Sequence, residues 1–332
     1  MSMKVVFFEV QEWEKDILAK HHPDALITEE KLNQETAVKY QDAEVTSCFI
    51  YSSVTKKVLD LMPSLKCIAT RSTGFDHIDV ASCHEKKIVV SNVPEYGSVT
   101  VAEHTFGLIL TLSRKLYQSI NQARELNFDH AQIRGVDLFG KTLGIIGLGK
   151  IGKHILKIAQ GFGMKVIVYN RSQDATLSQS LHFSYVNLDQ LVSQSDFITL
   201  HLPLSKETMH IINKDIMMRF KRGSFLVNTA RGGLVDTEAL VMGLEKGILR
   251  GVALDVMEGE KDLNDEITVL TSEYKKEVDL KTLVLDHILM RHPNVIITPH
   301  NAFNSEEAIT RIAFTTIGNI KSFISGIPIN TV

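Results

Sequence analysis

Short apolar runs alternate with longer stretches of helical periodicity along most of the chain. Examples are VVFF near the N-terminus, LGII at 143–146 and VIVY at 166–169, which are continuous rather than alternating with polar residues. Continuous apolar runs are typical of parallel strands that are buried on both faces. The runs predict strands at Lys4–Val10, Ala43–Ile50, Leu65–Thr70, Ile88–Ser91, Thr142–Ile146, Lys165–Tyr169, Phe197–Leu200, Ser224–Asn228, Gly251–Asp255 and Val295–Thr298.

Between these runs the apolar residues recur at helical spacing. The spacing predicts helices at Ser98–Gln122, Gly152–Gly161, Leu188–Ser193 and Asp236–Lys246. Strands that alternate with helices favour doubly wound parallel sheets with right-handed crossovers. Because an α/β pattern already precedes residue 142, we expect two such sheets. The boundary between them is expected before the long helix that opens near residues 97–98.

The composition is that of a globular protein without an electrostatic preference for nucleic acid or membranes. Of the 332 residues 44% are hydrophobic and 23% are charged, and the net charge is −3. The longest apolar stretches are too short to span a bilayer. Cys48, Cys67 and Cys83 lie far apart without a CxxC pair, which disfavours a disulfide framework and a zinc site. We therefore expect a cytoplasmic protein with neither nucleic acid nor a membrane as partner.

A glycine-rich turn follows the predicted strand Thr142–Ile146. It reads Gly147-Leu148-Gly149-Lys150-Ile151-Gly152, and the strand Lys165–Tyr169 closes the unit after a helix. In such a unit the glycines permit a tight turn and a close approach of the backbone to a pyrophosphate at the helix N-terminus. The chain is therefore predicted to bind a nicotinamide dinucleotide, either NAD or NADP.

The position after the second strand of this unit favours NADP. A carboxylate there normally accepts hydrogen bonds from the ribose 2′-hydroxyl and repels a 2′-phosphate, but this chain has Asn170 followed by Arg171. An amide does not repel phosphate, and a guanidinium can pair with it bidentately. The alternative is that Asn170 bonds the ribose as a neutral acceptor while Arg171 points to solvent, which would suit NAD.

Six motifs resemble the D-isomer-specific 2-hydroxyacid dehydrogenases, in the same order and over nearly the whole chain. They are STGFDHID at 72–79, VPEYGSVTVAEHTFGLIL at 93–110, HLPLSKETMHIIN at 201–213, VNTARGGLVDTEAL at 227–240, GVALDVMEGE at 251–260 and NVIITPHNAF at 294–303. The resemblance implies a homodimer whose subunit has two Rossmann-like domains with the active-site cleft between them. Residues 97–301 would bind the nucleotide. Residues 1–96 and a returning tail, 302–332, would form the substrate domain.

The resemblance places the catalytic residues at Arg231, Glu260 and His300. An arginine at a strand end can hold the substrate carboxylate as a two-pronged pair and polarise the adjacent carbonyl. His300 would protonate the carbonyl oxygen as hydride arrives and take the proton back in the reverse direction. An ionised Glu260 bonded to the imidazole would favour its protonated form.

Further site residues carry over from the family. The backbone amides of Thr73 and Gly74 align with the carboxylate cradle, and Tyr96, Tyr51 and Phe303 match aromatic residues of the D-lactate dehydrogenase branch, although core packing also accounts for Tyr51 and Phe303. His104 is expected to be structural, and no histidine is assigned to a metal. The cofactor would be contacted by Gly147, Gly149, Lys150, Ile151, Gly152, Asn170, Arg171, Leu202, Pro203, Thr208, Thr229, Ala230 and Asp255.

The resulting hypothesis is a reversible reduction of a small 2-keto acid to the D-2-hydroxy acid. Pyruvate and D-lactate are favoured because the aromatic positions suit that branch, whereas Asn170-Arg171 favours an NADPH-dependent glyoxylate or hydroxypyruvate reductase. A hypothesis of another class is an NAD(H)-sensing scaffold that binds other proteins. The charged stretch at 258–281 is expected to be a surface insertion near the active site in sequence, with either a passive role or one in access.

Overall fold

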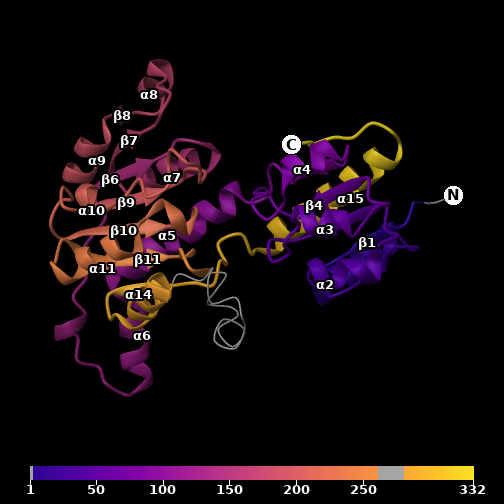
Figure 1. Ribbon diagram of the computed structural model, residues 1–332. Coiled ribbons are helices and arrows are strands. Elements are labelled where there is room, and N and C mark those ends of the chain that lie inside the picture. The colour runs from indigo at the N-terminus through magenta and orange to yellow at the C-terminus, as the bar shows by residue number, and fades with distance from the viewer. Residues whose placement is uncertain (1–2, 261–279) are drawn as a thin grey trace. The chain divides into compact units, whose positions relative to one another are not determined.

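The computed structural model describes residues 3–260 and 280–332, which form two compact units. Unit 1 comprises residues 1–97 and 304–332, and unit 2 comprises residues 98–303. Unit 1 is therefore discontinuous in sequence. In Figure 1 its C-terminal helix α15, coloured yellow, lies beside the indigo and violet elements of the first 97 residues.

Unit 1 is built on a five-stranded sheet in the order β2-β1-β3-β4-β5, and every strand pair is parallel. Helices α1 and α15 cover one face, where Leu18 and Ile317 are buried, and α3 and α4 cover the other, where Leu59 and Cys83 are buried. The strands are β1 Val5–Phe7, β2 Leu26–Ile27, β3 Val45–Cys48, β4 Cys67–Thr70 and β5 Val89–Ser91. The helices are α1 Glu12–His21, α2 Gln34–Ala37, η1 Val38–Tyr40, α3 Lys56–Asp60, α4 Val80–Glu85 and α15 Glu306–Ile324.

Unit 2 is built on a seven-stranded sheet in the order β12-β11-β10-β9-β6-β7-β8, again with parallel pairs. The strands are β6 Thr142–Ile146, β7 Lys165–Tyr169, β8 Ser184–Tyr185, β9 Phe197–Leu200, β10 Ser224–Asn228, β11 Leu249–Leu254 and β12 Val295–Ile297. The helices are α5 Ser98–Arg114, α6 Leu116–Arg124, η2 Ala131–Ile133, α7 Lys150–Gly161, α8 Ala175–Ser180, α9 Leu188–Gln194, α10 Lys214–Met217, η3 Gly232–Leu234, α11 Thr237–Glu245 and α14 Leu280–Arg291.

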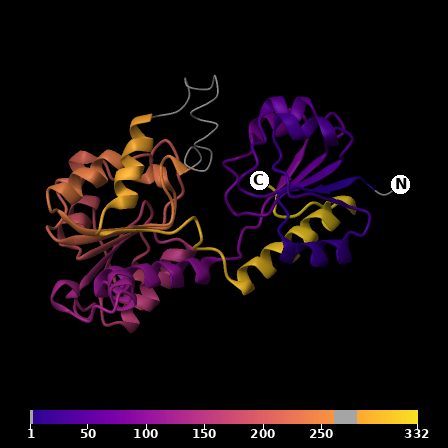
Figure 2. The same ribbon diagram turned by 90° about the horizontal axis from the view of Figure 1, so that it is seen from below.

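Helices cover both faces of the seven-stranded sheet, and each face has its own apolar core. Residues of α5 and α7 pack with one face, and residues of α9, α11 and α14 pack with the other. Figure 2 shows this layering within unit 2, with the orange helices on one side of the sheet and the magenta ones on the opposite side. The continuous apolar runs are explained by this double burial, since strands such as β9 have no exposed face.

The predicted fold class, parallel α/β sheets of the Rossmann kind, is confirmed. Four predicted strands, those at 142–146, 165–169, 197–200 and 224–228, have the observed bounds. The prediction of one helix over Ser98–Gln122 is wrong, because Lys115 has a left-handed backbone (φ 49°) that separates α5 from α6. Most of the charged insertion lies outside the described residues. Among the described residues no helix is long and apolar enough to cross a membrane.

Candidate active site

The glycine-rich turn joins β6 to α7. Gly147 has φ 99°, a conformation that side chains rarely adopt, and a Cβ there would lie 2.7 Å from the His201 carbonyl oxygen. A Cβ on Gly152 would lie 2.4 Å from the Gly147 carbonyl oxygen, so this glycine lets the helix pack on the turn. By contrast, a Cβ on Gly149 would meet no atom within 4 Å. Space is therefore open at the helix N-terminus, where no side chain caps α7.

An uncapped N-terminus of this kind fits a dinucleotide pyrophosphate. The first amide groups of a helix lack partners within the helix, and the helix dipole favours an anion at this end. Lys150 and Ile151 are the first two residues of α7, and their contact with a cofactor stays a prediction. The turn and the helix therefore have the form that a dinucleotide site needs.

Asn170 follows β7 and is fixed by two neighbours. Its Oδ1 accepts a hydrogen bond from the Leu148 amide at 3.1 Å, and its Nδ2 donates to the Ser172 carbonyl at 2.6 Å. The amide thus links the glycine turn to the segment after β7. Arg171 is exposed, and its charge also acts on Glu207, whose pKa is lowered chiefly by a hydrogen bond from Ser205 and in smaller part by Arg171.

Two further cofactor segments begin at the carboxyl ends of β9 and β10. After β9, Thr208 Oγ1 donates to the Pro203 carbonyl at 2.7 Å and holds the turn that begins at the half-buried Leu202. After β10, the Asn228 side chain accepts from the Ala230 amide at 3.0 Å and donates to the Arg231 carbonyl at 2.8 Å. Both turns therefore lie at the edge of the sheet that carries the glycine turn, where doubly wound folds bind their ligands.

Thr229 and Arg231 follow β10 directly. Thr229 is buried, and its hydroxyl pairs with that of Thr105 on α5 at 2.9 Å. Arg231 is half-buried and its Nη1 donates to the Ala230 carbonyl at 2.8 Å. The next residue, Gly232, packs on the segment after β11, because a Cβ there would lie 2.2 Å from the Met257 carbonyl carbon and 2.5 Å from the Glu258 nitrogen. The arginine loop and the segment leading to Glu260 are thus in direct backbone contact.

Asp255 holds the turn that carries His300. Its carboxylate is 1% exposed and accepts hydrogen bonds from the amides of Asn301 at 2.8 Å and Ala302 at 2.9 Å, and from the Thr298 hydroxyl. The Nε2 of His104 lies 3.5 Å from the same carboxylate. Burial acts to raise the pKa of Asp255, but these hydrogen bonds outweigh it and lower the pKa, so the group stays ionised. The predicted contact of Asp255 with the cofactor stays a prediction beside this structural role.

His300 and Glu260 form a hydrogen-bonded pair. The distance from His300 Nδ1 to Glu260 Oε1 is 2.8 Å, and the side chains are 24% and 29% exposed. His300 has a left-handed backbone (φ 51°), and its amide donates to the Asp255 carbonyl at 2.9 Å. A non-glycine residue in this region requires support from its surroundings, and the turn held by Asp255 gives that support. Because Nδ1 is bonded to the carboxylate, Nε2 is the nitrogen left for a substrate.

The predicted carboxylate cradle belongs to unit 1. Thr73 Oγ1 donates to the Val93 carbonyl at 2.6 Å, and Ser72 Oγ donates to the Gly74 carbonyl at 2.6 Å, so the turn after β4 is fixed by side chains. Within the described ranges, the amides of Thr73 and Gly74 donate no hydrogen bond to the protein. Two adjacent amides of a rigid turn are suitable donors for a carboxylate.

The three predicted aromatic residues lie on loops. Tyr51 is 45% exposed in unit 1, with Lys31 Nζ 5.6 Å from its ring centroid. Tyr96 is half-buried and its carbonyl accepts from Arg311 at 2.7 Å. Phe303 is half-buried, three residues after His300 in unit 2. Burial is therefore incomplete at all three positions.

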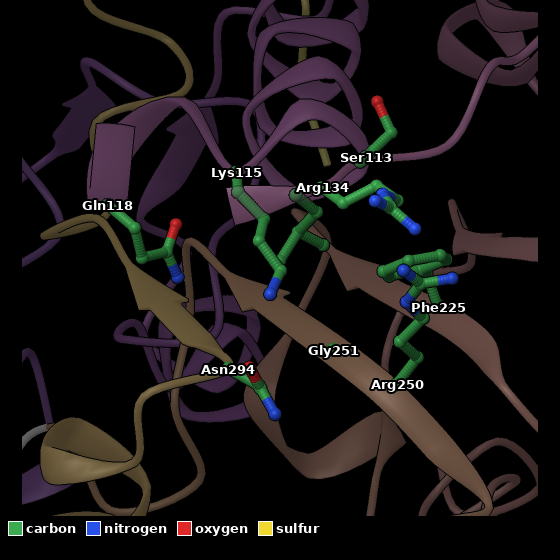
Figure 3. Close-up of a pocket in the computed structure, with 10 residues that line it drawn as sticks. Ser113, Lys115, Gln118, Arg134, Phe225, Arg250, Gly251 and Asn294 are labelled. Carbon is green, nitrogen blue, oxygen red and sulfur yellow. The ribbon is translucent and has the colours of Figure 1, made fainter. Parts of the chain in front are cut away.

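A separate cavity lies at the opposite edge of the seven-stranded sheet. It has a volume of about 180 Å³ and includes Phe225 and Gly251, near the amino ends of β10 and β11. Figure 3 shows the cationic side chains of Lys115, Arg134 and Arg250 around it. It contains none of the predicted site residues. Because ligands of doubly wound sheets bind beyond the carboxyl ends of the strands, this cavity is distinct from the candidate active site.

Sequence reasoning missed the residues that support the site. Asn228 and Thr298 each fix a loop that carries a predicted catalytic residue, and His104, expected to be structural, contacts Asp255. The only sequence signal for Asn228 and Thr298 was that each is the last residue of a predicted strand. In the described part of the chain, no group of three or more His, Cys, Asp or Glu side chains is placed to hold a metal ion.

Comparison with known proteins gives a family for this site. The family model described as "D-isomer specific 2-hydroxyacid dehydrogenase, NAD binding domain" matches residues 106–302. The "2-hydroxyacid dehydrogenase A" of Aspergillus oryzae is 35% identical over 97% of this chain and 92% of its own length.

Solved structures agree with the family match. The D-lactate dehydrogenase of Aquifex aeolicus, complexed with NAD and lactic acid, has a TM-score of 0.86 at 35% identity and covers 97% of this chain and 96% of its own. The pyruvate reductase of Chlamydomonas reinhardtii has a TM-score of 0.86 at 31% identity, with 98% of each chain covered. Because the family model matches more than half of the chain and relatives are 35% identical over nearly all of it, the chain belongs to the D-isomer-specific 2-hydroxyacid dehydrogenases, a family of oxidoreductases.

Proposed function

We propose that this protein reduces a small 2-keto acid to the D-2-hydroxy acid with NADH or NADPH, reversibly, and that pyruvate and D-lactate are its substrate pair. The observation that carries the proposal is the 2.8 Å contact between His300 and Glu260, in the unit that also holds Arg231 and the glycine turn. A relative named for lactate and another named for pyruvate support the choice of substrate.

The proposed chemistry divides among three side chains. The guanidinium of Arg231 binds the substrate carboxylate and polarises the neighbouring keto group. His300 Nε2 gives its proton to the keto oxygen, and Glu260 stabilises the protonated imidazole from the Nδ1 side. A bound nicotinamide dinucleotide supplies the hydride. In the oxidation direction, His300 takes the proton from the hydroxyl group.

Other parts of the chain are assigned to binding. Unit 2 holds the cofactor through its glycine turn and the segments after β7, β9 and β10, and unit 1 contributes the substrate domain. There the amides of Thr73 and Gly74 bind carboxylate oxygens, and Tyr51 and Tyr96 contact the substrate, as Phe303 does from unit 2. The unpartnered amides of the turn after β4 support the first of these assignments.

NADPH is the proposed preference at the adenosine ribose. Asn170 places no charge at this position, because its side chain is a neutral amide, and both ends of that amide are bonded to neighbouring groups. The exposed guanidinium of Arg171 can then pair with a 2′-phosphate. The carboxylate of Glu207, which also interacts with the charge of Arg171, would compete with the phosphate. A preference for NADPH would also support the alternative substrates, glyoxylate and hydroxypyruvate.

A homodimer is proposed from the family and from the surface of unit 2. Large apolar side chains are exposed along α6 and the segment after it: Leu116 at 41%, Tyr117 at 59%, Ile120 at 52%, Leu126 at 83% and Phe128 at 78%. A contiguous set of this kind is typical of a protein interface. The three cysteines are buried free thiols, which supports a reducing compartment such as the cytoplasm.

The deciding experiment follows absorbance of the reduced nicotinamide with pyruvate, glyoxylate and hydroxypyruvate, using NADH and NADPH in turn. Faster turnover of pyruvate than of the other acids supports the D-lactate assignment. Faster turnover of glyoxylate or hydroxypyruvate with NADPH replaces it with the alternative. Negligible turnover of every acid, with tight cofactor binding, would instead support the NAD(H)-sensing scaffold.

A further inference from the structure

The segment between β11 and Glu260 is held by a second carboxylate, that of Glu258. The Glu258 Oε1 lies 2.5 Å from His210 Nε2, and its Oε2 accepts hydrogen bonds from the Thr237 hydroxyl at 2.9 Å and the Thr237 amide at 3.2 Å. Thr237 is the first residue of α11, so this carboxylate also lies at a helix N-terminus. With 23% of its side chain exposed, Glu258 is largely enclosed by these partners.

Backbone contacts confine the same segment on its other sides. Gly232 packs against the peptide that joins Met257 to Glu258. The next residue is held as well: the Gly259 amide donates to Asp286 Oδ2 of α14 at 3.1 Å, and a Cβ on Gly259 would lie 2.7 Å from that oxygen. Two carboxylates thus fix the two residues before Glu260. Glu258 is held through its own carboxylate, which accepts from Thr237 of α11, and Gly259 is held by the carboxylate of Asp286 on α14.

We propose that Glu258 is a positioning residue, which through His210 and Thr237 fixes the backbone that presents Glu260 to His300. The proposal deepens the proposed function and rests on it, because it assigns a cause to the geometry of the catalytic pair. Glu258 does not reach the imidazole of His300 itself. It acts through the two peptide bonds that separate it from Glu260.

The chemistry of this cluster explains why a carboxylate is needed. One carboxylate oxygen pairs with the His210 imidazole and the other accepts two hydrogen bonds from Thr237, so three partner atoms define the position of the Glu258 carboxylate. An amide side chain of the same size can present only one oxygen to these partners. It could keep both contacts only with its NH2 group facing the imidazole, which would then have to accept at Nε2, and the charged carboxylate that holds both partners would be gone. The segment would therefore gain freedom next to Glu260.

His210, the partner of Glu258, also connects the segments after β9 and β10, both of which are assigned to the cofactor. His210 has a left-handed backbone (φ 49°), and its amide donates to the Gly233 carbonyl at 2.9 Å. His210 ends the segment that begins at Leu202, which is assigned to the cofactor. Displacement of Glu258 would disturb Glu260, whereas the glycine turn, which Asn170 holds through the Leu148 amide, stays intact.

The test compares Glu258→Gln with the wild type and with Glu238→Gln as a matched control. Glu238 is an exposed carboxylate on α11 that pairs with Lys214 and Lys281. We expect kcat to fall about 10- to 100-fold in Glu258→Gln, the size of effect that follows from a misplaced catalytic group, with less than a twofold change in the Kd of NADH. Glu238→Gln should retain the wild-type kcat.

The split between kcat and KM separates positioning from general damage. When Glu260 is displaced from His300, the chemical step slows while the substrate still binds, so kcat should fall and the KM for pyruvate should change less than twofold. The variant His210→Asn, chosen because asparagine tolerates a left-handed backbone, removes the partner of Glu258 and should lower kcat with the same small change in KM.

A measurement that does not depend on turnover separates the positioning role of Glu258 from the proposed function. In protein with ¹⁵N-labelled histidine, the Nδ1–H resonance of His300, assigned with His300→Asn, reports the hydrogen bond to Glu260. An upfield displacement or loss of this resonance in Glu258→Gln supports positioning even if the wild type reduces no keto acid, in which case only the proposed function is overturned. An unchanged resonance and kcat in an active enzyme overturn the positioning role. If Glu258→Gln does not fold, Thr237→Val, which removes only the hydroxyl donor, must show a smaller displacement of the same sign, and an unchanged resonance in it overturns the proposal.

Discussion

Asp286 allows a prediction of stability against pH. The side chain is 1% exposed on α14, and it accepts the Gly259 amide at 3.1 Å. Burial, and to a lesser extent the nearby Glu258, raise its pKa from 3.8 to about 6, against the opposing effects of the Gly259 amide and His287. The ionised form is therefore less favourable in the folded protein than in the unfolded chain.

The sign follows from proton binding in the two states. Below about pH 4 the group is protonated in both states, and its contribution to stability is fully present. Between pH 4 and 6 the unfolded chain releases the proton first, so stability falls as the pH rises through the folded pKa. A shift of about two units corresponds to a loss of about 3 kcal/mol at neutral pH. Asp286→Asn, which keeps an oxygen for Gly259, should remove this loss.

The assay is urea-induced unfolding of wild type and Asp286→Asn at pH 7.5 and pH 4.5. Circular dichroism is the suitable probe, because the single tryptophan, Trp13, belongs to unit 1 and does not report on α14. We expect the variant to be more stable by about 3 kcal/mol at pH 7.5 and by about 1 kcal/mol at pH 4.5. Asp137→Asn, at an exposed carboxylate of the same unit, is the control and should show no such difference. A gain that is absent, or equal at both pH values, would refute the reasoning.

Three further predictions concern the proposed site. His300→Asn, whose new side chain tolerates the left-handed backbone, should lower kcat by about 10²- to 10⁴-fold and leave the Kd of NADH unchanged; wild-type turnover would remove His300 from the mechanism. Arg231→Lys should lower kcat/KM for pyruvate about 30-fold, the equivalent of about 2 kcal/mol for a lost two-pronged charged pair, and steady-state kinetics with an unchanged kcat/KM would contradict the carboxylate contact. Asn170→Asp should lower kcat/KM for NADPH about tenfold or more relative to NADH, by repulsion of the 2′-phosphate, and an unchanged ratio of the two values would place the phosphate elsewhere.

The parts of the fold that follow from local sequence were predictable. The strands of unit 2 have long apolar runs, so the predicted bounds of Thr142–Ile146 and Phe197–Leu200 are the observed ones. The two-residue strand Leu26–Ile27 was missed because so short a segment has no detectable period. The break at Lys115 was missed because the apolar pattern continues across it while only the backbone changes.

The site was predictable only where a motif carries it. The residues Arg231, Glu260 and His300 stand in long motifs, and the structure brings the last two into contact. The pairing of His210 with Glu258 joins positions 48 residues apart, and neither periodicity nor composition reports a contact of that kind. The same applies to Asp255, whose hydrogen bonds to the turn at 298–302 depend on the packing of β11 beside β12.

The discontinuity of unit 1 has a consequence for how the protein is made. Its sheet buries Phe7 and Ala69 in one cluster with Ile317 and Ile320 of α15, so the part of this face that α1 does not cover stays exposed until residues 306–324 leave the ribosome. Unit 2 is continuous and is synthesised in between. At about 5–20 residues per second, the first 97 residues wait about 10–40 s for their partner helix. During translation the nascent N-terminal segment is therefore the part of the chain that most needs a chaperone, although it is made first.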